Sequence, residues 1–112
     1  MRFSVVIPTF NRKDILRQCL KSLQAQDFTD FEVLVVDGGN DGTEEMLARE
    51  FPGFRYLREE RSGPSVARNL GIEQATGEIV AFTDDDCLPP PDWLSKMADG
   101  YRRYPTVSGV AG

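Results

Sequence analysis

The sequence predicts an α/β fold: a mostly parallel sheet of four to five strands, with helices on both faces. Strand-like and helix-like segments alternate four times along the 112 residues, the order expected of parallel strands joined by helices. The strand-like segments are continuous apolar runs, typical of strands buried on both faces. The length suits one small domain, and no repeat or linker divides it, so we assign residues 1–112 to one domain.

The first three segments predict a strand–helix–strand unit. Residues 3–7 form a β-branched apolar run that Pro8 stops, which predicts a buried strand. Residues 12–23 carry apolar side chains at helical spacing, and Cys19 falls on this apolar face as a small core residue. Residues 31–36 repeat the pattern of a buried strand.

The second helix and third strand are marked by capping and breaking residues. Asp41 is expected to be the N-cap of the helix, with Glu44 three residues later as its capping-box partner. Pro52 and Gly53 end that helix. Residues 54–57 then predict a short third strand.

The third helix opens at Gly63 and Pro64, because proline suits a first helical turn. Gly77 is expected to cap its C-terminus, and residues 78–82 predict the fourth strand. The side chains expected to face inward from this helix are Val66, Ala67 and Leu70.

The last segments predict a fourth helix and the start of a fifth strand. Asp92 is expected to begin the helix, which runs to about residue 104. We favour packing against the sheet for Trp93 over stacking on a sugar. Because residues 107–112 begin another strand, we expect the domain to be truncated and to continue beyond Gly112. The exposed sheet edge and apolar surface that would result predict self-association or a disordered tail.

Composition excludes several classes of function. A net charge of −5, from 18 acidic and 13 basic residues, argues against a nucleic-acid-binding protein. The absence of histidine excludes imidazole catalysis and His-ligated zinc, so a metal ion would be held by oxygen, which favours Mg²⁺ or Mn²⁺. No signal peptide or membrane-spanning run fits the sequence, and we expect a cytoplasmic location.

The triplet Asp84-Asp85-Asp86 is the strongest indication of a binding site. It directly follows the fourth predicted strand, and ligands of α/β sheets bind at such strand ends. Adjacent carboxylates raise one another's pKa, and a divalent cation reverses that repulsion. The triplet therefore predicts a site for a metal–nucleotide complex.

Four loops are expected to meet at the carboxyl ends of the strands. They comprise residues 8–12, 37–42, 62–69 and 84–86. Each has a purely structural alternative: Thr9 and Asn11 suit helix capping, Gly39 suits a turn, and Arg68 suits a solvated helix face. Their joint occurrence at four successive strand ends favours a binding site.

The chain resembles the nucleotide-binding half of a family 2 glycosyltransferase with the Rossmann-like GT-A fold. The resemblance spans nearly all 112 residues and rests on the order and spacing of several motifs. The motifs are SVVIPTFNR at 4–12, VVDGG at 35–39, DGT at 41–43, Gly63, ARNLGI at 67–72, ATGEI at 75–79, FTDDD at 82–86 and PDWL at 91–94.

The resemblance implies a metal-dependent site for a nucleotide-sugar donor, with UDP the expected nucleotide. Asp86 would bind Mn²⁺ or Mg²⁺ on the donor diphosphate, and Asp84 would bind the ribose or support the metal ion. Asp37 would bind the base, while Asp85 joins the site or faces solvent. The nucleotide-binding residues so implied are Pro8, Thr9, Asn11, Arg12, Asp37, Gly39, Arg68, Asp84 and Asp85, with Asp84 and Asp86 as metal ligands.

Two features depart from the family pattern. Gly38 replaces a second acid that many relatives carry, in a loop one residue shorter, so nucleotide preference is open. Cys87 stands where an acid is frequent. The catalytic base is unknown and expected beyond Gly112, since Asp92 and Asp99 suit their own helix.

The resemblance implies inverting transfer to an unknown acceptor, which is a sugar, lipid or polysaccharide, in the cytoplasm or at the inner membrane face. The alternative is a nucleotide- and metal-binding module that catalyses nothing.

Two other α/β classes fit poorly. A receiver domain needs acids after its first strand, and a nucleotidyltransferase needs glycines there, but residues 8–12 contain neither.

Overall fold

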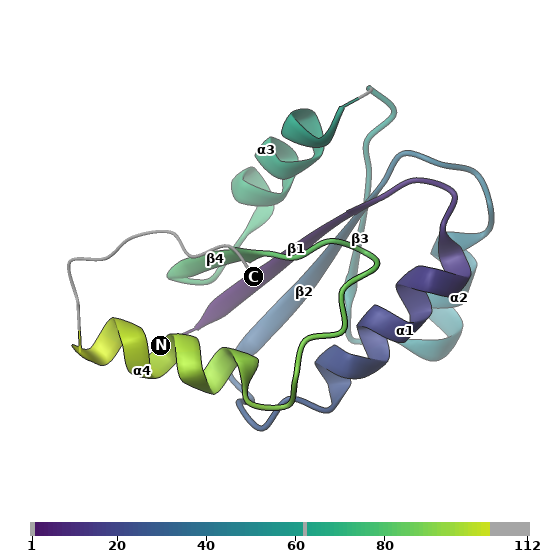
Figure 1. The fold of residues 1–112 in the computed structure, drawn as a ribbon. Helices are drawn as coiled ribbons and strands as arrows, with labels where there is room; N and C mark the ends of the chain where they lie inside the picture. Colours follow the sequence, from purple (N-terminus) through teal and green to yellow (C-terminus); the bar gives the residue numbers. More distant parts are fainter. Residues whose placement is uncertain (1, 62, 104–112) are drawn as a thin grey trace.

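A computed structural model describes residues 2–61 and 63–103 and confirms the predicted α/β class. Its sheet has four parallel strands in the order β3-β2-β1-β4 (Figure 1). The strands are β1 (Phe3–Thr9), β2 (Phe31–Asp37), β3 (Arg55–Arg58) and β4 (Ile79–Phe82).

Helices cover both faces of the sheet (Figure 1). From β1 through β2 to β3 the chain steps in one direction, and from β3 to β4 it returns across the sheet. Because such crossovers are right-handed, the return places α3 on the face opposite α1 and α2. The helices are α1 (Lys13–Gln24), α2 (Thr43–Glu50), α3 (Pro64–Gln74) and α4 (Trp93–Arg103).

The main core lies on the face that α1, α2 and α4 share. Alternate β1 residues, Phe3, Val5 and Ile7, are fully buried there beside Cys19, as predicted, and Trp93 packs against the same core. On the other face, Val6 meets Gly71 of α3 so closely that a Cβ on Gly71 would lie 2.9 Å from Val6 Cγ2. The remaining buried core side chains come from the three helices, from β2 and β4, and from Phe51 directly after α2.

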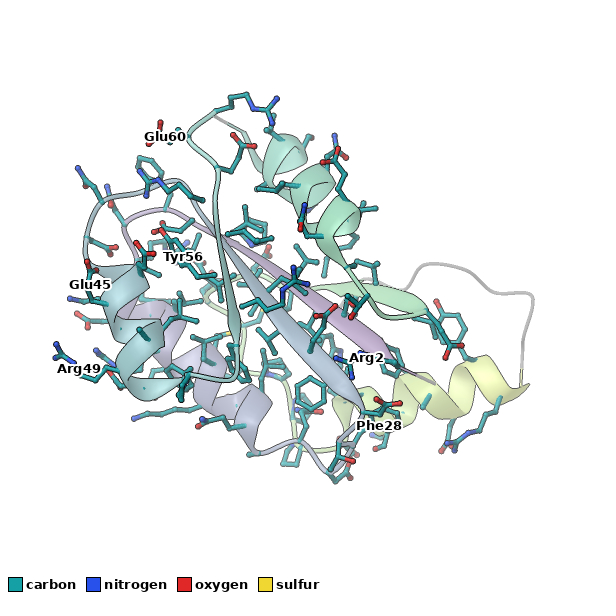
Figure 2. The ribbon with its side chains drawn as sticks, turned by 180° about the vertical axis from the view of Figure 1, so that it is seen from behind. Arg2, Phe28, Glu45, Arg49, Tyr56 and Glu60 are labelled. Atoms are coloured by element: carbon teal, nitrogen blue, oxygen red, sulfur yellow. The ribbon has the colours of Figure 1, made fainter. Side chains whose placement is uncertain are left out.

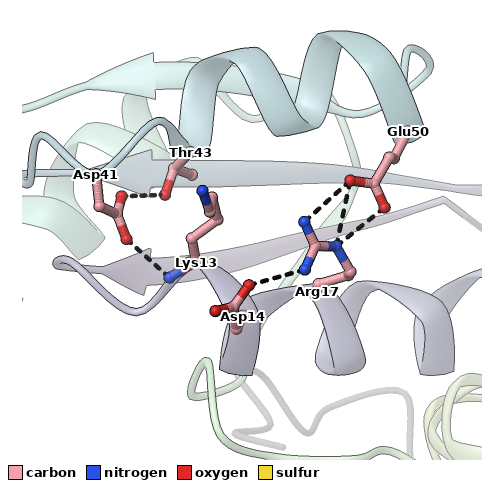
Figure 3. Close-up of polar contacts among 6 residues, drawn as sticks. All are labelled: Lys13, Asp14, Arg17, Asp41, Thr43 and Glu50. Carbon is pink, nitrogen blue, oxygen red and sulfur yellow. Dashed lines mark hydrogen bonds and ion pairs between the residues drawn. The ribbon is translucent and has the colours of Figure 1, made fainter.

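The predicted Asp41 cap of the second helix is wrong. The N-cap residue of α2 is Gly42, in the left-handed region at φ +89°, and it makes no side-chain capping bond. Asp41 Oδ2 instead accepts the N–H of Lys13, the first residue of α1, at 2.9 Å (Figure 3). Its Oδ1 accepts the Thr43 hydroxyl at 2.7 Å, so one carboxylate joins the starts of two helices.

Gly77 does not cap the third helix, which ends at Gln74. It lies instead against β1, where its N–H donates to Ser4 Oγ at 2.8 Å and a Cβ would come within 2.8 Å of the Ser4 nitrogen. The predicted fifth strand, at 107–112, falls outside the described residues. No helix in the described part of the chain is long and apolar enough to span a membrane.

Candidate functional site

The four predicted loops do meet at one end of the sheet. Parallel pairing aligns Thr9 with Asp37 and Asp37 with Arg58, so β1, β2 and β3 end together. Glu60 follows β3 at this end, whereas Arg2 and Phe28 lie at the other (Figure 2). The loops line a cleft of about 510 Å³, within the usual size of ligand pockets. Its predicted lining residues are Pro8, Thr9, Arg12, Arg68, Asp84 and Asp85.

Burial alternates along the aspartate triplet, which follows β4 in a turn. Asp84 and Asp86 are exposed, whereas Asp85 is only 5% exposed, so the predicted solvent-facing alternative for Asp85 is wrong. Asp85 Oδ2 accepts the Thr9 hydroxyl at 2.9 Å, and its Oδ1 lies 3.2 Å from Arg12 Nη1. Burial raises the pKa of Asp85, although the Thr9 hydrogen bond and Arg12 oppose that rise.

The outward side of the triplet offers ligands for a divalent cation. One carboxylate oxygen each of Asp84 and Asp86 and the Cys87 thiol all lie within 4.8 Å of one another. Exposed carboxylates suit Mg²⁺ and Mn²⁺, so these residues fit the predicted metal ion. Arg12 reaches the same place, with Nη2 3.7 Å from Asp86 Oδ2.

The Asp37 carboxylate is buried and already bonded within the protein. It is 2% exposed; Oδ1 accepts the Gly39 N–H at 2.9 Å and Oδ2 accepts the Tyr56 hydroxyl at 2.8 Å. Arg58 lies 3.6 Å away and also donates to the Gly39 carbonyl. Burial and the Asp37 bond raise the pKa of Tyr56 to about 12, so the phenol stays protonated as a donor.

The loop after β1 packs closely on the loop after β2. Asn11 adopts a left-handed φ of +52°, and its Oδ1 accepts the Asn40 N–H at 2.7 Å. Gly39 leaves no room for a side chain, because a Cβ there would lie 2.6 Å from the Asn11 nitrogen. Gly39 and Asp37 line a neighbouring cleft of about 540 Å³ between α1 and α2, not the cleft that holds the triplet.

Sequence reasoning missed part of the cleft wall. Phe10 lines the cleft with its side chain 64% exposed, an unusual exposure for phenylalanine. Glu59, Glu60 and Arg61 complete the wall from the end of β3. The Phe10 signal was an aromatic residue inside a polar loop, whereas the Glu59 segment carries charges that also suit an ordinary surface.

Arg68 differs from the other guanidinium groups of the cleft. Arg12 pairs with Asp85, and Arg61 lies 2.7 Å from Glu59 Oε2. Arg68 lies over the Phe82 ring at 6.0 Å, and no ion pair to it occurs among residues 2–61 and 63–103. Its charge is therefore available to a bound anion.

The family model described as glycosyl transferase family 2 matches residues 4–111. The chain belongs to this family. Its sequence is 41% identical to the glycosyltransferase AglE of Haloferax volcanii, over 96% of the chain and 36% of AglE. The predicted family is thereby confirmed.

Solved structures of glycosyltransferases share the fold. Residues 1–349 of TarS of S. aureus, in complex with UDP-GlcNAc, have a TM-score of 0.81 and 32% identity over 93% of this family 2 chain and 32% of that fragment. The mannosyltransferase PcManGT of Pyrobaculum calidifontis, with GDP-Man and Mn²⁺, has a TM-score of 0.78 and 33% identity over 89% of this chain and 32% of the PcManGT chain. The chain thus spans about a third of AglE and of these two solved chains.

Proposed function

We propose that these residues form the donor-binding half of a metal-dependent, inverting glycosyltransferase that uses a UDP-sugar. The observation that carries the proposal is the alternation in the aspartate triplet. Asp85 is held inside the protein by Thr9 and Arg12, which leaves Asp84, at the cleft, and Asp86, beside it, exposed. Two fixed outward carboxylates suit a cation that a diphosphate shares.

The donor diphosphate would lie between the triplet and Arg68. A bound Mn²⁺ or Mg²⁺ ion would neutralise the charge that develops on the leaving nucleoside diphosphate. Asp86, with Asp84 beside it, would hold that ion. Arg68 has no ion pair within the described residues, so its guanidinium would meet the phosphate oxygens from the other side.

The nucleoside would lie along the loops after β1 and β2. The exposed Phe10 ring offers a flat apolar face to a base. Gly38 lies beside that ring, and a Cβ there would come 3.4 Å from Phe10 Cδ2 and 3.1 Å from the Glu59 carbonyl. The absence of a side chain at Gly38 therefore keeps the space near Phe10 open for the base.

TarS with UDP-GlcNAc supports a UDP donor, and PcManGT with GDP-Man and Mn²⁺ supports the metal ion. We propose that an acceptor sugar, lipid or polysaccharide and the carboxylate base belong to other residues of the full protein. Asp92, directly before α4, lies 3.1 Å from Lys96, and Asp99 lies 3.2 Å from Arg102, so both acids pair with side chains of α4. This pairing favours, as a second candidate, a chain that binds the donor without transferring its sugar.

Calorimetric titration of UDP tests the proposal, with Mn²⁺, with Mg²⁺ and with a chelator. UDP should bind more tightly with either metal ion, and Asp86→Ala should abolish that gain. Asp99→Ala, an exposed acid of α4, is the matched control and should retain it. If Asp86→Ala kept the full metal-dependent gain, the site assignment would be refuted. Transfer from a UDP-sugar to added acceptors separates the two candidate functions.

A further inference from the structure

Cys87 is folded back toward the aspartate triplet. Its N–H donates to the Asp84 carbonyl at 3.1 Å, which closes a turn around Asp85 and Asp86. The turn places Cys87 Sγ 4.0 Å from Asp86 Oδ1, on the same side as the exposed carboxylates. The thiol is half-buried, so solvent and ions reach it.

The spacing of the three ligand atoms suits one metal ion. Protein ligands lie roughly 2.0–2.5 Å from divalent metal ions, so two ligands on opposite sides of an ion are at most about 5 Å apart. The Asp84 and Asp86 oxygens and the Cys87 sulfur all fall within 4.8 Å of one another. The spacing is therefore compatible with one ion shared by all three residues.

A thiolate alters which ion such a site prefers. Mg²⁺ takes oxygen ligands in a strict octahedron and gains little from sulfur, whereas softer divalent ions bind thiolate well. The cysteine therefore replaces a hard donor with a soft one. This distinction does not depend on the sugar or the acceptor.

We propose that the Cys87 thiolate is a third protein ligand of the metal ion, and that it shifts the preference of the site from Mg²⁺ toward Mn²⁺ and softer ions. The inference rests on the proposed function, because it concerns the same metal site. On binding, the S–H proton of Cys87 passes to solvent and the sulfur lone pair forms the bond to the metal. No electron is transferred.

Cys19 provides an internal control. It is fully buried, and its Sγ faces the Asp84 carbonyl oxygen at 3.6 Å rather than the exposed carboxylates. Any spectroscopic signal of a metal ion bound to Cys87 should therefore persist in the variant Cys19→Ala. Cys87→Ser removes the soft ligand at nearly constant size, and Cys87→Asp supplies a hard ligand instead.

Cd²⁺ is the direct probe, because a cadmium–thiolate bond absorbs in the near ultraviolet. Titration with Cd²⁺ should produce this band in the wild type and in Cys19→Ala, but not in Cys87→Ser. In the presence of UDP, calorimetry should show that the ratio of Mn²⁺ affinity to Mg²⁺ affinity is about tenfold lower in Cys87→Asp than in the wild type. A change of this size is typical when residues around a bound metal ion are replaced.

The outcomes separate this inference from the proposed function. If Mn²⁺ tightens UDP binding but the Cd²⁺ band persists in Cys87→Ser, or never forms in the wild type, the thiolate ligand is refuted and the donor site stands. An unchanged Mn²⁺-to-Mg²⁺ ratio in Cys87→Asp likewise overturns the proposed selectivity. If no ion affects UDP binding in any variant, both proposals fail.

Discussion

Glu32 of β2 offers the sharpest test of how the sheet is held together. Its Oε2 accepts the Ser4 hydroxyl at 2.6 Å and both the N–H and the hydroxyl of Thr76, at 2.7 and 2.8 Å. Its Oε1 lies 3.1 Å from Arg55 Nη1. The side chain is 9% exposed and lies toward the end of the sheet opposite the cleft. Burial alone would raise the pKa of Glu32, but these hydrogen bonds lower it to about 2, from a model-peptide value of 4.5.

That lowered pKa corresponds to about 3 kcal/mol of stability above pH 5, at about 1.4 kcal/mol per pH unit. Because the folded-state pKa is below the unfolded-state value, the stabilisation is present above the unfolded value and is lost as the pH falls toward 2. In Glu32→Gln one acceptor becomes an amide donor that faces other donors. We expect the variant to lose about 3 kcal/mol at pH 7 and roughly half of that at pH 3.

Urea unfolding at pH 7, 5 and 3 measures the difference between the two proteins at each pH. Glu60→Gln is the control, because its carboxylate is 80% exposed and its 3.5 Å contact with Arg58 should contribute less than about 1 kcal/mol. A Glu32→Gln difference that stayed constant from pH 7 to pH 3 would show that the carboxylate charge is not the source of the stability.

Three further results are expected. Gly71→Ala should destabilise the chain by about 1–3 kcal/mol in urea unfolding, because the new Cβ would meet the Val6 side chain. Gly100→Ala is the control and should not destabilise the chain, because nothing lies within 4 Å of a Cβ at Gly100. Equal effects of the two changes would contradict the packing of α3 against β1. Asp85→Asn should cost about 1–3 kcal/mol of stability and weaken Mn²⁺-dependent UDP binding, because the buried group that contacts Thr9 and Arg12 loses its negative charge. If urea unfolding and UDP titration were both unchanged, Asp85 would not be the residue that holds the loop after β4 in place. Light scattering should show self-association that rises with protein concentration, because the outer edge of the short apolar strand β4 is unpaired within the described residues. A monomer at every concentration would contradict the predicted self-association.

The sequence was sufficient for the order of the elements and for most of the core. Apolar runs and helical spacing report burial directly, so Phe3, Ile7 and Cys19 were predicted to lie in the core and do so. The loops at the strand ends were also predictable, because parallel strands bring their carboxyl ends to one edge of the sheet.

The errors come from contacts between residues distant in sequence. Asp41 has the local pattern of a helix cap, yet it bonds to Lys13, 28 positions earlier, in another helix. Asp85 lies between two exposed acids, and its contacts with Thr9, 76 positions away, and with Arg12 account for its burial. Such bonds depend on the packed sheet, which local capping rules do not include.

The hydrogen bond between Thr9 and Asp85 also bears on the affinity of the proposed donor site. It joins the end of β1 to the loop after β4 at 2.9 Å, in a buried position. The loss of conformational freedom in that loop therefore occurs when the chain folds and not when the donor arrives. At the proposed donor site, a loop ordered in advance would lower the entropic cost of binding a diphosphate.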